Sequence, residues 1–186
     1  MTNGDIAGAY KTLEIASRMD AGNPDIDRMM ARVKPKWEAA EKRRKASLSA
    51  TELYKERGDE AYKNANFEGA IELYTKCIDE IRAGKGSKDL KLKALSNRAA
   101  CYKQISNFDG VIADCSEVLE AEPDNVKALV RRAQALEGVE RYRFALQDCK
   151  TVLSMPPKLV GDANLKLCNM MQHRLQRTVN QLKAMD

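Results

Sequence analysis

The stretch that decides the fold is residues 108–123, FDGVIADCSEVLEAEP, because it recurs further along the chain as residues 142–157, YRFALQDCKTVLSMPP. The two stretches agree in the kind of residue at six positions, always with the same offset: Phe108 and Tyr142, Val111 and Ala145, Asp114 and Asp148, Cys115 and Cys149, Leu119 and Leu153, and Pro123 and Pro157. Self-similarity at a fixed period of tens of residues is the signature of a repeat architecture. The sequence therefore predicts a stack of similar structural units.

An earlier copy of the repeat begins at Phe67, which precedes Phe108 by one period and seven further positions. The seven extra residues fit a loop at residues 83–87, AGKGS, and Ala70 and Tyr74 then take the small and aromatic or cysteine positions of the repeat. Three copies are predicted, over residues 51–82, 92–125 and 126–159.

A 34-residue period with a small residue, an aromatic or cysteine four positions later, and a closing proline resembles the tetratricopeptide repeat (TPR). The resemblance implies an all-α fold, in which three helix-turn-helix hairpins over residues 49–158 form a right-handed superhelix. No single hairpin buries its own apolar face, so the last one needs a cap. The capping helix is expected at residues 159–186, where apolar side chains recur on one helical face: Leu165, Leu167, Cys168, Met171, Leu175, Val179 and Leu182.

Local signals place several helix ends. Ser87 is expected to cap the helix after the glycine loop, and Asp124 the helix that begins near Val126. Residues 170 and 171 are both methionine, and packing against the third repeat is favoured over a role at a binding surface.

Residues 1–48 are predicted to form an N-terminal helical arm. Residues 22–24, Gly-Asn-Pro, separate two helices, and Pro35 should end or kink the second. Three roles remain open for this arm: packing on the first repeat, dimerisation, or tethering a client protein. The basic run at residues 42–45 is interpreted as a solvated helix face rather than a nucleic-acid site.

The amino-acid composition excludes several classes of function. The 186 residues are 44% hydrophobic and 5% aromatic, and 32 basic against 27 acidic side chains give a net charge of +5, which favours an anionic partner such as an acidic peptide. No run is apolar enough for a membrane helix and no signal peptide is seen, so a cytoplasmic protein is expected. Five cysteines without a CxxC pair and a single histidine predict neither a metal site nor a cofactor, and no catalytic motif indicates an enzyme.

The resemblance extends to a subset of TPR proteins that bind the C-terminus of chaperones through a two-carboxylate clamp. Four of the five clamp positions carry the matching residue here, namely Lys55, Asn97, Lys127 and Arg131. The fifth position is atypical, because Asp59 stands where the clamp normally has asparagine. The resemblance therefore implies a site for the carboxylates of a peptide ligand, altered at one position.

These residue types suit that ligand on chemical grounds as well. A terminal aspartate offers two carboxylates, which three cations and one amide can bind. Lys127 opposes the dipole of the helix that begins near it, at a cost of about 0.3–1 kcal/mol, so stability does not explain its presence. Asp59 lies four residues after Lys55, close enough to pair with it. We expect Asp59 to occupy part of the clamp in the free protein.

The sequence therefore predicts a co-chaperone-like adaptor that binds the acidic Glu-Glu-Val-Asp tail of a heat-shock chaperone of the seventy- or ninety-kilodalton class. The alternative is a TPR scaffold or assembly factor that binds an internal peptide or helix of another partner. The sequence does not select between the two chaperone classes, and it does not identify a client.

Overall fold

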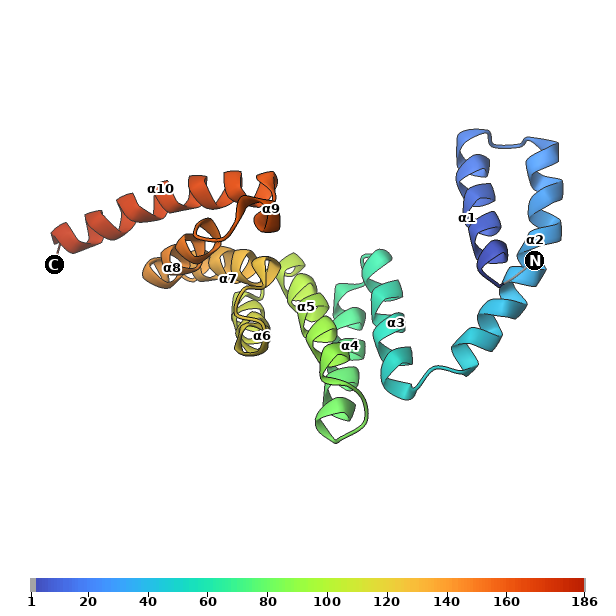
Figure 1. The fold of residues 1–186 in the computed structure, drawn as a ribbon, viewed down its shortest axis with the longest axis horizontal. Helices are drawn as coiled ribbons and strands as arrows, with labels where there is room; N and C mark the ends of the chain where they lie inside the picture. The colour runs from blue at the N-terminus through green and yellow to red at the C-terminus, as the bar shows by residue number, and fades with distance from the viewer. Residues whose placement is uncertain (1–2, 186) are drawn as a thin grey trace. The chain divides into compact units, whose positions relative to one another are not determined.

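The computed structural model describes residues 3–185, in which all regular secondary structure is helical (Figure 1). The chain divides into two compact units, Met1–Ser49 and Ala50–Asp186. The first holds α1 (Asn3–Met19) and α2 (Pro24–Ala46). The second holds α3 (Ala50–Lys63), α4 (Phe67–Arg82), α5 (Lys88–Gln104), α6 (Phe108–Ala121), α7 (Val126–Gly138), α8 (Tyr142–Leu153), α9 (Pro157–Val160) and α10 (Asp162–Met185). None of the helices in the described part of the chain is long and apolar enough to cross a membrane.

The first unit is a hairpin of α1 and α2. The side chain of Asn23 caps α2, and Pro24 occupies the first turn of that helix. The rings of Tyr10 and Trp37 stack across the hairpin, with their centroids 4.1 Å apart. Pro35 was expected to end or kink the second helix, and the first of these alternatives is wrong, because α2 continues through Pro35 to Ala46. Proline removes one helical hydrogen bond there, and solvent can take its place because the residue is exposed.

Three further hairpins, α3–α4, α5–α6 and α7–α8, make up the predicted repeats. Their turns share one design, with a residue in the left-handed region at the same place in each: Ala65, Ser106 and Glu140. In the first two turns an asparagine, Asn66 or Asn107, then accepts a hydrogen bond from the backbone amide of Gly69 or Gly110, each at 3.0 Å. The third turn has no side-chain cap of this kind.

The helix ends agree with the sequence in part. The hydroxyl of Ser87 caps α5 by accepting from the amide of Leu90 at 3.1 Å, as predicted. The cap of α7 is Asn125, which accepts from the amide of Ala128, so the prediction of Asp124 is wrong by one residue. Helix α5 also begins at Lys88, four residues before the start that the period alone gives.

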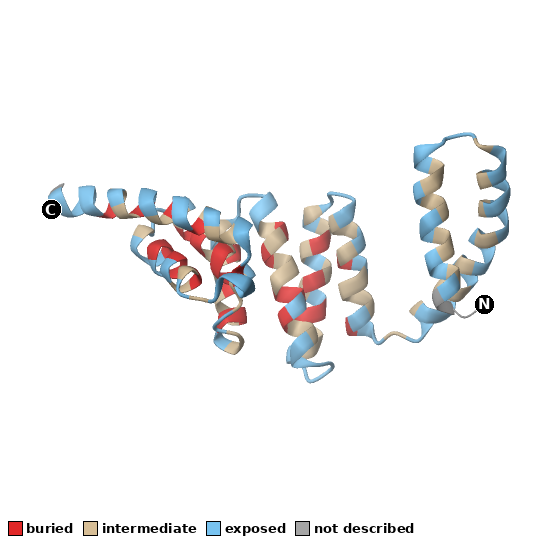
Figure 2. Ribbon diagram, turned by 45° about the horizontal axis from the view of Figure 1, so that its top comes forward, coloured by how far each residue is buried: buried red, intermediate tan, exposed pale blue. Residues whose placement is uncertain are grey.

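The core of the second unit lies between successive hairpins, where Figure 2 shows the buried residues. The repeated small position is filled by Ala70, Val111 and Ala145, all with 0% exposure. All five cysteines are buried and unpaired, and burial raises the pKa of the Cys115 thiol to about 12. Such thiols are unreactive and pack as small hydrophobic side chains.

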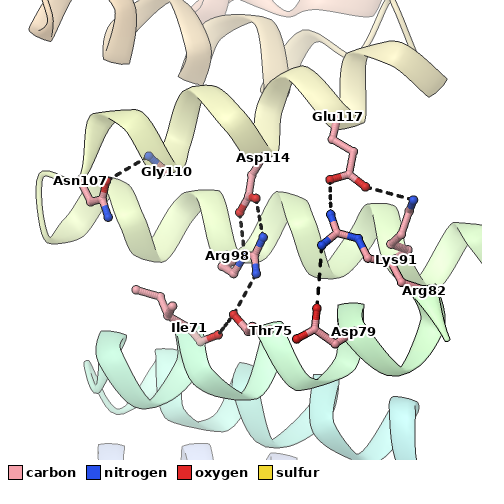
Figure 3. Close-up of polar contacts among 10 residues, drawn as sticks. All are labelled: Ile71, Thr75, Asp79, Arg82, Lys91, Arg98, Asn107, Gly110, Asp114 and Glu117. Carbon is pink, nitrogen blue, oxygen red and sulfur yellow. Dashed lines mark hydrogen bonds and ion pairs between the residues drawn. The ribbon is translucent and has the colours of Figure 1, made fainter.

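Ion pairs of two arginines join the two helices within a repeat, and Figure 3 shows the first of them. The guanidinium of Arg98 in α5 forms two hydrogen bonds with the carboxylate of Asp114 in α6, at 2.7 and 2.9 Å, and a third with the hydroxyl of Thr75 in α4. The next repeat has the same arrangement one period later, between Arg132 and Asp148. Each arginine therefore joins the two helices of its own repeat, and its further hydrogen bond, to Thr75 or Ser116, ties that repeat to the preceding hairpin.

Helix α10 caps the last repeat. Its buried face packs against α8 and consists of Cys168, Met171, Leu175 and Val179. The two methionines differ, since Met171 is 2% exposed and Met170 is 67% exposed. The prediction of core packing is therefore right for Met171 and wrong for Met170. The sequence did not indicate the four-residue helix α9 that precedes the cap.

Gly58 in α3 permits the close approach of Tyr74 in α4. A Cβ atom at Gly58 would lie 2.7 Å from Cε1 of the Tyr74 ring, which is 1% exposed. Alanine favours a helix over glycine by about 1 kcal/mol, yet the clash should exceed this gain. We expect Gly58→Ala to lower the free energy of unfolding by about 1–3 kcal/mol in urea denaturation followed by circular dichroism. Gly8→Ala in α1, where nothing lies within 4 Å, is the control and should not destabilise the protein.

Candidate functional site

The four predicted clamp residues line one pocket, of about 350 Å³, formed by α3, α5 and α7. Lys55 comes from α3 and Asn97 from α5, while Lys127 and Arg131 lie one turn apart on α7. The repeat explains this convergence, because the first helix of every hairpin faces the same side of the stack. The structure thus brings together side chains from all three repeats, which lie far apart in the sequence.

The α7 side of this pocket carries cations that are available to a ligand. The ammonium of Lys127 has no ion-pair partner among the residues that the structure describes, and the residue is exposed. The guanidinium of Arg131 donates one hydrogen bond, from Nη1 to the backbone carbonyl of Ser96 at 3.0 Å. This bond fixes the side chain and leaves its other N–H groups for a carboxylate.

Asp59 lies beside the clamp pocket and lines an adjoining pocket of about 300 Å³ together with Tyr74, Asn97 and Arg131, and from there it binds Lys55 and Asn97. Its Oδ2 accepts from the ammonium of Lys55 at 2.6 Å, so the predicted pairing of these residues is confirmed. Its Oδ1 accepts from the amide of Asn97 at 2.9 Å and from the hydroxyl of Tyr74 at 2.7 Å. Two of the four predicted ligand groups therefore bind an internal carboxylate.

The hydroxyl of Tyr74 in α4 holds the carboxylate of Asp59 in place by donating a hydrogen bond to it. Burial of the ring, together with the hydrogen bond to Asp59, raises the pKa of Tyr74 far above its ordinary value, so the phenol stays protonated and donates. The repeat pattern predicts only a packing role for Tyr74. One signal could have revealed more: the other two repeats have cysteine at this position, and only tyrosine brings a hydroxyl that needs a partner when buried.

Two acidic side chains line the clamp pocket, and the sequence pattern did not indicate either of them. Asp89 pairs with Lys93 at 2.7 Å, and Glu122 accepts from the side-chain amide of Asn125 at 2.7 Å. Asp89 lies on the extra first turn of α5, which the period of the repeat did not predict. The pocket is therefore less positive than its lysines and arginine alone suggest.

The stacked hairpins, their common turns and the capping helix make residues 50–185 a tetratricopeptide repeat domain. No protein-family profile matches the sequence. The chain is similar to the Hsp70/Hsp90 co-chaperone cns1 of Schizosaccharomyces pombe, with 33% identity over 74 residues, which make up 40% of this chain and 20% of that protein. The match thus covers about a fifth of that relative's length.

Solved TPR domains agree with this chain over nearly their whole length. The Arabidopsis OM64 TPR domain has 27% identity and a TM-score of 0.54, and the match covers 69% of this chain and 96% of that domain. The second TPR domain of human RPAP3, solved in complex with the HSP70 peptide SGPTIEEVD, has 26% identity and a TM-score of 0.55. That match covers 68% of this chain and 95% of the RPAP3 domain.

Proposed function

We propose that the TPR domain binds the C-terminal acidic peptide, ending Glu-Glu-Val-Asp, of a heat-shock chaperone of the seventy- or ninety-kilodalton class. The chain then acts in the cytoplasm as a co-chaperone-like adaptor, by binding rather than by catalysis. The observation that carries this proposal is the convergence of Lys55, Asn97, Lys127 and Arg131 on one pocket. The RPAP3 domain, which was solved with a peptide of this ending, supports the choice of ligand.

Binding proceeds in two parts under this proposal. The first carboxylate of the terminal aspartate pairs with Lys127 and Arg131, which have no carboxylate partner within the described residues. The second carboxylate pairs with Lys55 and Asn97, and for this it must replace Asp59, which holds both groups in the free protein. Asp59 keeps its bond to Tyr74 and weakens the binding of a dicarboxylate end.

A calorimetric titration tests the proposal directly. Peptides with the tail of either chaperone class should bind with a free C-terminal carboxylate and lose most of their affinity when the C-terminus is amidated, since amidation removes one of the two charges. Equal affinity of the free and amidated peptides would contradict the terminal clamp. It would favour the alternative, a scaffold that binds an internal peptide.

Substitution of Asp59 tests whether the second carboxylate of the ligand must displace Asp59 from Lys55 and Asn97. Asp59→Asn keeps an acceptor for Tyr74 and releases Lys55. Two unit charges 4 Å apart repel by about 4 kcal/mol at an effective dielectric constant near 20, and less in an open pocket. We expect about tenfold tighter binding of the free tail peptide, or about 1.4 kcal/mol.

The matched control is Asp89→Asn, which removes one carboxylate from the lining of the clamp pocket itself and frees only Lys93. Its effect on calorimetric affinity should stay within about twofold to threefold, the size of a screened surface interaction. A gain that is the same for both variants would mean that Asp59 acts only through the overall charge of the pocket.

A further inference from the structure

The N-terminal hairpin, taken by itself, has an incomplete core. No residue between 5 and 49 is buried, although α1 and α2 each carry an apolar stripe. Ile15, Met19 and Met29 are between 50% and 84% exposed. Helices in proteins gain most of their stability from packing an apolar face against another element. The two helices of the hairpin therefore leave apolar surface for a further partner.

One side of the hairpin forms a groove of about 240 Å³ between α1 and α2. Its floor is aliphatic, consisting of Ile6, Ala9, Met29 and Val33, and its rim carries Arg32 and Lys36. These two cations lie one turn apart on α2, and both are exposed. Neither has a hydrogen bond or an ion pair within the part of the chain that the structure describes. Arg28, one turn earlier, differs because it pairs with Asp25 at 3.3 Å.

We propose that this groove binds an acidic amphipathic helix of a partner protein, which completes a three-helix bundle. The groove runs between two antiparallel helices, the place where a third helix packs. Apart from the two cations, its lining offers no side-chain hydrogen-bonding group. A helix satisfies its own backbone groups, whereas an extended peptide would leave them without partners.

The chemistry of the groove specifies the partner helix. Apolar side chains with the spacing i, i+3, i+4 and i+7 cover the aliphatic floor, and the small side chain of Ala9 lets the helix approach closely. Two carboxylates one turn apart on the edge of the partner helix pair with Arg32 and Lys36. Charge complementarity therefore favours an acidic helix over a basic or neutral one.

The test uses a synthetic 21-residue helical peptide with leucines on one face and glutamates along both edges of that face. Its C-terminus is amidated, so it lacks the terminal carboxylate that the proposed clamp of the TPR domain binds. Failure of this experiment thus leaves the proposed function untouched, and the reverse also holds. Trp37, the only tryptophan of the chain, lies in this hairpin and reports binding by its fluorescence.

Charge reversal at the rim gives the decisive comparison. Arg32→Glu with Lys36→Glu should lower the affinity for the acidic peptide at least tenfold and raise it for a peptide with lysine in place of glutamate. Lys34→Glu with Lys42→Glu makes the same change in net charge at exposed residues of α2 outside the groove lining, and should change affinity less than threefold. All four positions are exposed, so circular dichroism should show unchanged helicity.

Three results would overturn the proposal. The first is an equal loss of affinity in both double variants, which indicates attraction without a defined site. The second is sedimentation velocity showing a dimer that both rim substitutions dissociate and the peptide does not, which makes a second copy of the chain the occupant. The third is rim-dependent binding to phosphatidylserine vesicles with no binding of the peptide, which makes a lipid surface the occupant.

Discussion

Asp114→Leu should lower the free energy of unfolding by about 3–5 kcal/mol, the cost of leaving one member of a buried ion pair without its partner. Asp114 and Arg98 have side chains only 4% and 12% exposed, so water does not replace the lost carboxylate. Arg98 would keep its bond to the hydroxyl of Thr75 and lose both bonds to the carboxylate (Figure 3). Urea denaturation with linear extrapolation measures the change.

The double variant Arg98→Met with Asp114→Leu should recover most of this loss. Taking two charges out of water costs about as much as their attraction returns, so an apolar pair of similar volume is often as stable. Burial costs the carboxylate of Asp114 its hydration and raises its pKa above the ordinary value, against the opposing effect of Arg98. The first repeat already has Leu73 at the position of Asp114.

The third repeat provides the control. Asp148→Leu removes the same kind of carboxylate, but the side chain of its partner Arg132 is 25% exposed and can turn toward water. We therefore expect a clearly smaller loss than at Asp114. Equal losses in the two repeats, or a double variant no more stable than Asp114→Leu alone, would contradict this explanation.

The fold was predictable because the regular spacing of matching residues is enough to identify a repeat architecture. Identical offsets between aromatic, small and proline positions predicted the second and third hairpins, a seven-residue insertion placed the first, and the one-sided apolar stripe after Pro157 predicted the cap. Details within one repeat, such as which residue caps a helix, were harder to predict. Asp124 and Asn125 are adjacent and both are good capping residues, so the choice between them depends on backbone angles that the pattern does not contain.

In the candidate site, too, contacts within one helix were predictable and contacts between helices were not. The pair of Lys55 and Asp59 followed from their spacing on one helix. The contacts of Asp59 with Tyr74 and Asn97 join residues 15 and 38 positions apart, on neighbouring helices. Such contacts depend on how closely α3, α4 and α5 pack, which the sequence does not state. The sequence therefore identified Asp59 as the atypical residue of the clamp, but it did not predict the hydrogen bonds of Asp59 with Tyr74 and Asn97.

Arg131→Ala should weaken the binding of the free tail peptide by about 2–5 kcal/mol, because it removes one member of a charge pair that is hydrogen-bonded and partly desolvated in the complex. Arg131→Lys should give an intermediate loss, since a lysine keeps the charge and cannot form a bidentate contact. Lys93→Ala is the matched control. That cation lines the same pocket and is already paired with Asp89, so its loss should cost less than about 1 kcal/mol.

Arg131 also supports the fold, because it donates to the carbonyl of Ser96, and its removal should lower stability by about 0.5–1.5 kcal/mol. A double cycle separates this effect from binding, by titrating wild type and Arg131→Ala with the free and the amidated peptide. If Arg131 contacts the terminal carboxylate, the substitution weakens binding of the free peptide far more than of the amidated one. An equal loss with both peptides would place the ligand's carboxylate elsewhere and leave Arg131 a structural residue between α5 and α7.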